Sequence, residues 1–317
     1  MQEALAAYPS MSLYATEENA YQANHMQSIF QKTVWALTKQ VRAGQFVPED
    51  FELNFSTLRE NGADSVGVVA LEDDVQMLLK GRIDRLDICE NEDGICVKIV
   101  DYKSGGTSLD LSKLYQGLQL QLVVYMNAAM ELCKRNHKDI PIVPAGILYY
   151  NIDDPVLESD EKLSQEEAEH ALLLALRPDG LVNRKESIYR AMDELVEGKS
   201  DVIPLELKKS GELSEARSHV ADTEEFELLS RYVAQQIQKQ GQAIYNGEVG
   251  VNPYRNGNTE SCTYCPYAGV CGIDARLPGY RFRKEVKLSK EEVWERIRTE
   301  LAKEAHSKNA GDRREEA

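Results

Sequence analysis

Apolar residues recur every three to four positions in three long stretches of the chain. These stretches cover residues 18–42, 109–135 and 223–245. Because an α-helix turns once every 3.6 residues, this spacing places the apolar side chains on one helical face. The sequence therefore predicts three long helices, each packed along one side.

The first of these helices is predicted to carry its apolar face at Tyr21, Met26, Ile29, Val34, Leu37 and Val41. Gly44 is predicted to end it. A fourth helix is predicted from Ser289, where Glu292 completes a capping box. After His306 the chain is strongly charged and is predicted to be disordered.

Short runs rich in β-branched residues predict strands between and after the first two helices. They cover residues 66–70, 77–79, 95–100 and 142–150. Polar turns separate the first three of these runs, as expected for strands. Residues 91–94 are predicted to form a hairpin connection, whose final glycine can take a positive φ.

This order of strands and helices favours an α/β fold with a mixed central sheet flanked by helices. Residues 153–169 are acidic and are predicted to be an exposed loop. Five segments are expected, namely an N-terminal helical segment (1–50), a core with the hairpin and the second helix (51–150), a remainder with acidic loops and helices (151–250), a cysteine loop (251–275), and a C-terminal helix with a disordered tail (276–317).

The composition is that of a globular protein, with 317 residues of which 42% are hydrophobic and 28% charged. No apolar run approaches the roughly 18 to 20 residues of a membrane helix. No basic stretch followed by an apolar one marks a secretory signal. We therefore expect a cytoplasmic protein, whose thiols stay reduced.

The six cysteines fall into two groups. Cys89, Cys96 and Cys133 stand among apolar neighbours and are expected to be small buried side chains. The others are spaced C-x₂-C-P-x₄-C, at Cys262, Cys265 and Cys271. Three thiolates in one short loop suit zinc or an iron–sulfur cluster, and either centre needs a fourth ligand that this loop does not supply.

A candidate catalytic site lies in the predicted hairpin. Residues two apart in a strand share a face, so Asp101 and Lys103 project together. If Glu90 and Ile95 flank the turn, counting back places Asp84 opposite Asp101. The Cβ atoms of directly opposed residues are roughly 4.5 to 5.5 Å apart.

Two carboxylates that close repel each other unless a cation lies between them or one is protonated. A hard divalent ion such as Mg²⁺ or Mn²⁺ fits that place. With Lys103 beside it, the group suits metal-assisted hydrolysis of a phosphodiester. The alternative is that Asp84 and Asp101 are ordinary hairpin charges, paired with Arg82, Arg85 or Lys103.

The sequences GRIDRLD (81–87), VDYKSG (100–105) and QLVVY (121–125) resemble motifs of the PD-(D/E)xK nucleases of the RecB and AddB type. The resemblance implies a restriction-endonuclease-like fold and metal-dependent DNA cleavage. It implies that Asp84 and Asp101 bind the metal, with the Tyr102 carbonyl as a further ligand. Lys103 is then expected to assist the attack on the phosphate.

The family's Q-x-x-x-Y motif falls on Gln121 and Tyr125. A spacing of four places both on one helix face, where they brace the site or touch the DNA strand. The alternative is a partly buried polar pair on an amphipathic helix.

The resemblance also implies that the three loop cysteines bind a 4Fe-4S cluster together with a cysteine upstream of the nuclease core. Residues 1–88 contain no cysteine, and the surroundings of His25 do not match the family's metal-site histidine. We therefore expect the C-terminal fragment of a longer AddB-type subunit. Its expected role is Mg²⁺-dependent exonuclease cleavage of single-stranded DNA, together with an AddA-type helicase subunit, in recombinational repair of double-strand breaks.

Two other interpretations stay open. One is a non-catalytic DNA-end-binding or assembly module of the same complex, because the upstream motifs are missing. The other is a stand-alone RecB-like nuclease of the CRISPR-adaptation type. The net charge of −16 argues against a broad basic DNA-binding surface and fits a protein whose partner supplies most phosphate contacts.

Overall fold

The computed structural model describes residues 16–55, 67–157, 162–256 and 259–315. The chain forms two units. The first contains Met1–Phe55, Gly81–Leu109 and Ala128–Thr223, and the second contains Ser56–Lys80, Asp110–Asn127 and Glu224–Ala317.

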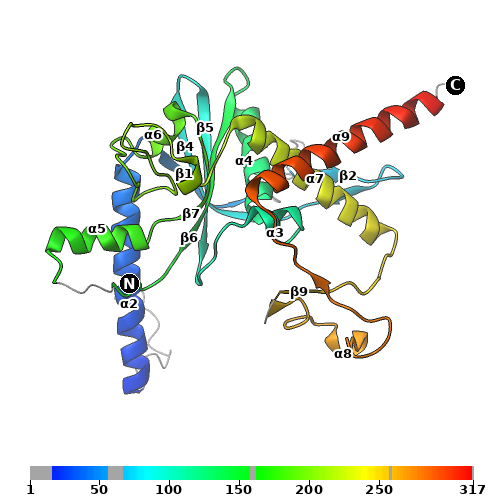
Figure 1. The fold of residues 1–317 in the computed structure, drawn as a ribbon, viewed down its shortest axis with the longest axis horizontal. Helices are drawn as coiled ribbons and strands as arrows, with labels where there is room; N and C mark the ends of the chain where they lie inside the picture. Colours follow the sequence, from blue (N-terminus) through cyan, green and yellow to red (C-terminus); the bar gives the residue numbers. More distant parts are fainter. Residues whose placement is uncertain (1–15, 56–66, 158–161, 257–258, 316–317) are drawn as a thin grey trace. The chain divides into compact units, whose positions relative to one another are not determined.

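The first unit is built on a six-stranded sheet in the order β1-β4-β5-β6-β7-β8 (Figure 1). Its strands are β1 (Val47–Asn54), β4 (Arg82–Asn91), β5 (Gly94–Lys103), β6 (Ile142–Asn151), β7 (Asp179–Asn183) and β8 (Val220–Ala221). β4 and β5 form an antiparallel hairpin, whereas β5 and β6 run parallel. The expected mixed α/β sheet is confirmed.

The helices of this unit are α2 (Glu17–Arg42), α5 (Gln165–Ala175), α6 (Glu186–Met192) and the short 3₁₀ helix η3 (Glu215–Arg217). Helix α4 (Gln121–Asn136) begins in the second unit and ends in the first. No helix among the described residues is both long and apolar enough to span a membrane.

The second unit contains α3 (Leu111–Tyr115), α7 (Thr223–Tyr245), α8 (Ala268–Cys271) and α9 (Lys290–Glu315). It also contains a hairpin of β2 (Val68–Ala70) and β3 (Gln76–Leu78), and a small sheet of β9 (Tyr254–Asn256), β10 (Thr259–Glu260) and β11 (Arg283–Lys284). The ring of Tyr115 stacks on that of Tyr232 at 5.5 Å between centroids. This contact joins α3 to α7.

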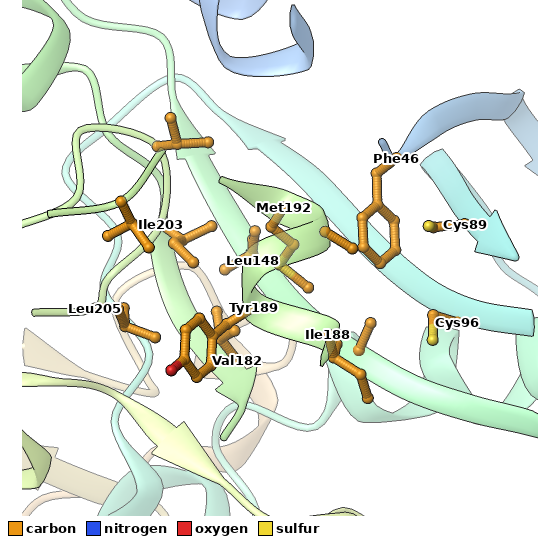
Figure 2. Packing of buried hydrophobic residues seen from close by; sticks show 14 of the residues in the cluster. Phe46, Cys89, Cys96, Leu148, Val182, Ile188, Tyr189, Met192, Ile203 and Leu205 are labelled. Atoms are coloured by element: carbon orange, nitrogen blue, oxygen red, sulfur yellow. The ribbon is translucent and has the colours of Figure 1, made fainter. Parts of the chain in front are cut away.

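One face of the large sheet is covered by an apolar cluster (Figure 2). Leu148 of β6 and Val182 of β7 pack there with Ile188 and Met192 of α6. Cys89 and Cys96, which lie directly opposite each other in the hairpin, belong to the same cluster. Side chains alternate along a strand, so the residues between these point to the other face.

Three predicted elements differ from the structure. The helix predicted over 109–135 is two helices, α3 and α4, because Gly117 adopts a left-handed φ of 81° between them. The predicted acidic loop is helical from Gln165, where α5 begins with Ser164 as its cap, and residues 158–161 of that prediction lie outside the described residues. The tail predicted to be disordered after His306 continues α9 to Glu315, in a stretch without proline and rich in good helix formers.

Helix α2 buries a different face from the predicted one. Tyr21 and Met26 are 70% and 57% exposed, whereas Ala36 is fully buried. Gln40 of this helix donates a hydrogen bond of 3.2 Å to the carbonyl of Leu176. Small side chains allow close packing, which a count of large apolar residues misses. Strand β1 begins at Val47, inside the segment expected to be helical.

Replacing Gly94 by alanine is expected to lower the free energy of unfolding by about 3 kcal/mol. Gly94 has a φ of 114°, and an added Cβ would lie 2.2 Å from the carbonyl oxygen of Pro141. Gly211→Ala is the matched control, since Gly211 has a φ of 83° but open space around it. The Gly211→Ala variant is expected to lose about 1 kcal/mol of unfolding free energy. Urea denaturation measures both, and equal losses would contradict the steric argument.

Candidate active site

The pairing of β4 with β5 sets the positions of the candidate catalytic residues. Glu90 lies opposite Ile95, as predicted, and pairing continues to Arg85 opposite Val100. The predicted register is confirmed as far as this last pair of the ladder. One further step in the same register would place Asp84 opposite Asp101.

The three predicted groups lie together at this end of the hairpin. The backbone N–H of Tyr102 donates a 2.9 Å hydrogen bond to Oδ2 of Asp84. Nζ of Lys103 lies 2.6 Å from Oδ2 of Asp101. It also lies 5.5 Å from the centre of the Tyr149 ring, on the strand next to β5.

Asp101 is in an unfavourable environment for a carboxylate. Its side chain is 2% exposed, and Oδ2 accepts no hydrogen bond of ordinary geometry although the Lys103 ammonium is close. Burial raises the pKa of Asp101 above its ordinary value, and the charge of Asp84 adds to this rise, while Lys103 opposes it. A buried oxygen with spare acceptor capacity beside a second carboxylate fits a hard divalent cation.

The arginines of the hairpin do not neutralise this pair. Nε of Arg82 lies 2.7 Å from Oε2 of Glu52. Arg85 is paired with Asp87 on the opposite face of the sheet. The alternative interpretation pairs the two aspartates with Arg82, Arg85 or Lys103. Of these, Lys103 lies against Asp101 in the structure.

A buried ionic group that the sequence did not predict lies on that opposite face. Nε and Nη2 of Arg85 donate to Oδ1 and Oδ2 of Asp87 at 2.6 and 2.7 Å. Nζ of Lys98 lies 2.9 Å from Asp87 and 4.8 Å from the centre of the Phe46 ring. The odd spacing between Asp84 and Asp87 was the available signal, since it places them on different faces.

Arg85 also connects this ionic group to the catalytic strand. Its Nη1 lies 3.5 Å from the hydroxyl of Tyr102, the residue between Asp101 and Lys103. The Tyr102 ring makes an edge contact with that of Tyr150, at 5.8 Å between centroids. The side chain of Tyr102 is therefore held on the core face while its N–H binds Asp84 on the other.

The two residues of the Q-x-x-x-Y motif lie in the first turns of α4. Nε2 of Gln121 donates a 2.9 Å hydrogen bond to the hydroxyl of Tyr125. The prediction that they share a helix face is confirmed by this contact. Gln121 is exposed and Tyr125 is half-buried.

The cysteines occupy the two predicted environments. Cys89, Cys96 and Cys133 are buried, and burial raises the pKa of Cys96 to about 12. Cys262, Cys265 and Cys271 are half-buried in and beside α8. Across the described ranges, no three histidine, cysteine or acidic side chains are gathered as a metal site, and this includes the loop thiols.

The histidine of the first helix lies in a surface pair. Nδ1 of His25 is 3.6 Å from Oδ2 of Asp154, and its ring stacks on that of Tyr21. This agrees with a surface histidine.

A mixed sheet whose central hairpin brings two carboxylates and a lysine together fits the class of metal-dependent nucleases. Within that class, the chain belongs to the PD-(D/E)XK nuclease superfamily, whose family model matches residues 1–272.

Several curated proteins are similar to this chain over most of its length. A protein of Lachnoclostridium phytofermentans, named as a subunit of an ATP-dependent helicase/deoxyribonuclease, is 37% identical over 309 residues, covering 95% of this chain and 25% of the relative. Proteins of the same name from Thermoanaerobacter sp. (strain X514) and Acetivibrio thermocellus are 34% and 35% identical, covering 90% and 85% of this chain and 24% and 23% of the relatives. The chain thus spans about a quarter of their length.

Replacing Asp87 by alanine is expected to lower the free energy of unfolding by about 3 to 5 kcal/mol, because two cations would stay buried without their carboxylate. Glu186→Ala is the control. Its carboxylate is 67% exposed and pairs with Arg190, and its loss is expected to cost less than about 1 kcal/mol. Chemical denaturation monitored by circular dichroism measures both. Similar losses for the two variants would show that Asp87 does not stabilise the core.

Proposed function

We propose that this chain is the nuclease part of an AddB-type subunit, which hydrolyses phosphodiester bonds of single-stranded DNA with Mg²⁺ or Mn²⁺. The observation that carries the proposal is the group of Asp84, Asp101 and Lys103 at one end of the β4–β5 hairpin. Family membership and the named relatives support it.

Asp84 and Asp101 are the proposed side-chain ligands of the cation, with the carbonyl of Tyr102 as a third ligand. When bound, a divalent cation would make a water more acidic and offset the charge that develops on the phosphate. The fit rests on the spare acceptor capacity of buried Asp101 and on its closeness to Asp84.

Lys103 is the proposed group that assists the attack. Its ammonium lies against Asp101 and is about one-third exposed, so it can meet a phosphate while staying next to the carboxylates. The positive charge of Lys103 beside the reacting phosphate would stabilise negative charge in the transition state. Gln121 and Tyr125 are proposed to contact the DNA strand through the exposed amide and its hydrogen-bonded hydroxyl.

The cysteine loop is proposed to hold a 4Fe-4S cluster through Cys262, Cys265 and Cys271. Thiolates are the ligands that such clusters take, and the spacing brings three of them into ten residues. The fourth ligand would come from outside the residues that the structure describes.

The names of the relatives, which join a helicase to a deoxyribonuclease, support the proposed biological setting. We propose that the chain works with an AddA-type helicase subunit in the cytoplasm, in repair of double-strand breaks by recombination. The net charge of −16 is consistent with a partner that supplies much of the basic DNA track.

Asp101→Asn is expected to reduce cleavage of a labelled single-stranded oligonucleotide by about 10³-fold or more, because the amide keeps the shape but loses the charge that holds the cation. Gel electrophoresis of the products, with Mg²⁺ and with EDTA, measures the rate. Glu186→Gln, an exposed carboxylate of the same unit, is expected to cleave like the parent chain. Equal rates for Asp101→Asn and the parent would remove Asp101 from the reaction.

An anaerobic preparation is expected to contain iron and acid-labile sulfide, and Cys265→Ser is expected to lose most of both. Cys133→Ala, which removes a thiol buried in the first unit, is expected to keep them. Metal analysis and sulfide assay check this. Stoichiometric zinc without sulfide would contradict the iron–sulfur assignment.

A further inference from the structure

Two consecutive glycines, Gly105 and Gly106, follow the catalytic strand immediately after Lys103 and Ser104. Neither has a left-handed backbone, and a Cβ on either would meet no atom within 4 Å. The situation differs at Gly180, where a Cβ would lie 2.1 Å from a carbonyl oxygen. The fold itself therefore does not require glycine at 105 or 106.

The loop that carries these glycines is fixed on both sides. The carbonyl of Lys103 accepts a 2.7 Å hydrogen bond from the N–H of Ile152. Oδ1 of Asn151 accepts from the N–H of Thr107 at 2.8 Å, and Nδ2 of Asn151 donates to the carbonyl of Thr107 at 2.9 Å. One side chain thus binds both backbone groups of a single loop residue.

The far end of the loop is fixed by Asp179. Oδ2 of Asp179 accepts a 2.8 Å hydrogen bond from the N–H of Leu109, and Oδ1 lies 3.0 Å from Nδ1 of His219. Burial raises the pKa of Asp179, but the bonds from His219 and Leu109 outweigh it and hold the pKa below its ordinary value. Asp179 therefore stays a charged acceptor at neutral pH, and it ties this end of the loop to β7.

These attachments argue against flexibility as the reason for the glycines, since the chain on either side of them is held. Glycine also allows close approach of another molecule to the backbone, and here that approach would be from solvent, because residues 104–106 are exposed. The position directly after Lys103 places such a molecule beside the carboxylate pair.

We propose that residues 104–106 contact a backbone phosphate of the DNA strand next to the scissile bond, and that Asn151 and Asp179 are the positioning residues of this loop. The proposal rests on the proposed function, which supplies DNA as the substrate. Backbone N–H groups bind phosphate without adding charge, and they give no preference for base sequence.

The test is equilibrium binding of a fluorescein-labelled single-stranded oligonucleotide, measured by anisotropy in the Asp101→Asn background so that the strand stays intact. Gly106→Asp is expected to raise Kd about tenfold, through repulsion of a phosphate at short range. Gly106→Ala is expected to raise it about threefold by bulk alone. Gly250→Asp makes the same charge change at another open glycine and is expected to leave Kd unchanged.

Asn151→Ala tests the positioning role. It is expected to raise Kd, and Gly106→Asp added to it is expected to raise Kd by less than it does alone, because both changes act through one loop. Equal Kd values for Gly106→Asp and Gly250→Asp would overturn the proposal, as would full additivity with Asn151→Ala. Failure of the proposed function would be seen in a different experiment, in which Asp101→Asn cleaves DNA as fast as the parent chain.

Discussion

One pairing register between β4 and β5 determines how Asp84 lies relative to Asp101 and Lys103. Side chains alternate along a strand, so a slip of one residue would turn Asp101 into the apolar core and bring Val100 to the site. The turn at residues 91–94 sets this register, and its Gly94 packs too closely against Pro141 to accept a side chain. The site is therefore specified by a turn several residues away from the chemistry.

The two faces of the hairpin divide stability and function between them. On the core face, Arg85 and Lys98 converge on Asp87. A register shift would carry Lys98 of β5 away from Asp87 of β4 and leave its charge buried without that partner. On the other face, Asp101 is buried beside Asp84 with an oxygen that lacks a well-formed hydrogen bond. The ion pairs of Asp87 thus help to hold Asp84 and Asp101 close together, although the two carboxylates repel each other. A cation bound between the carboxylates would offset that repulsion.

The sequence predicted the parts of the fold that follow a simple period or a turn rule. Helix α7 and the hairpin register are examples, as is the Gln121–Tyr125 contact. The helices and strands from α5 to β8 were not predicted, because these short elements are held by contacts with residues distant in the sequence. For the same reason Asn151 and Asp179 were not identified, because their partners lie 44 and 70 positions away in the sequence.

The proposed action of an acidic chain on DNA carries a constraint of its own. With a net charge of −16, its long-range field repels DNA, and two carboxylates at the centre of the site add to the repulsion. The lysine beside them is already close to Asp101, so much of its charge is offset before a strand arrives. Apart from a bound cation and a basic partner, the attraction that this chain itself supplies is then expected from groups that act at contact. Neutral backbone donors on a fixed loop meet that requirement, because their hydrogen bonds form at short range and do not depend on the protein's overall charge.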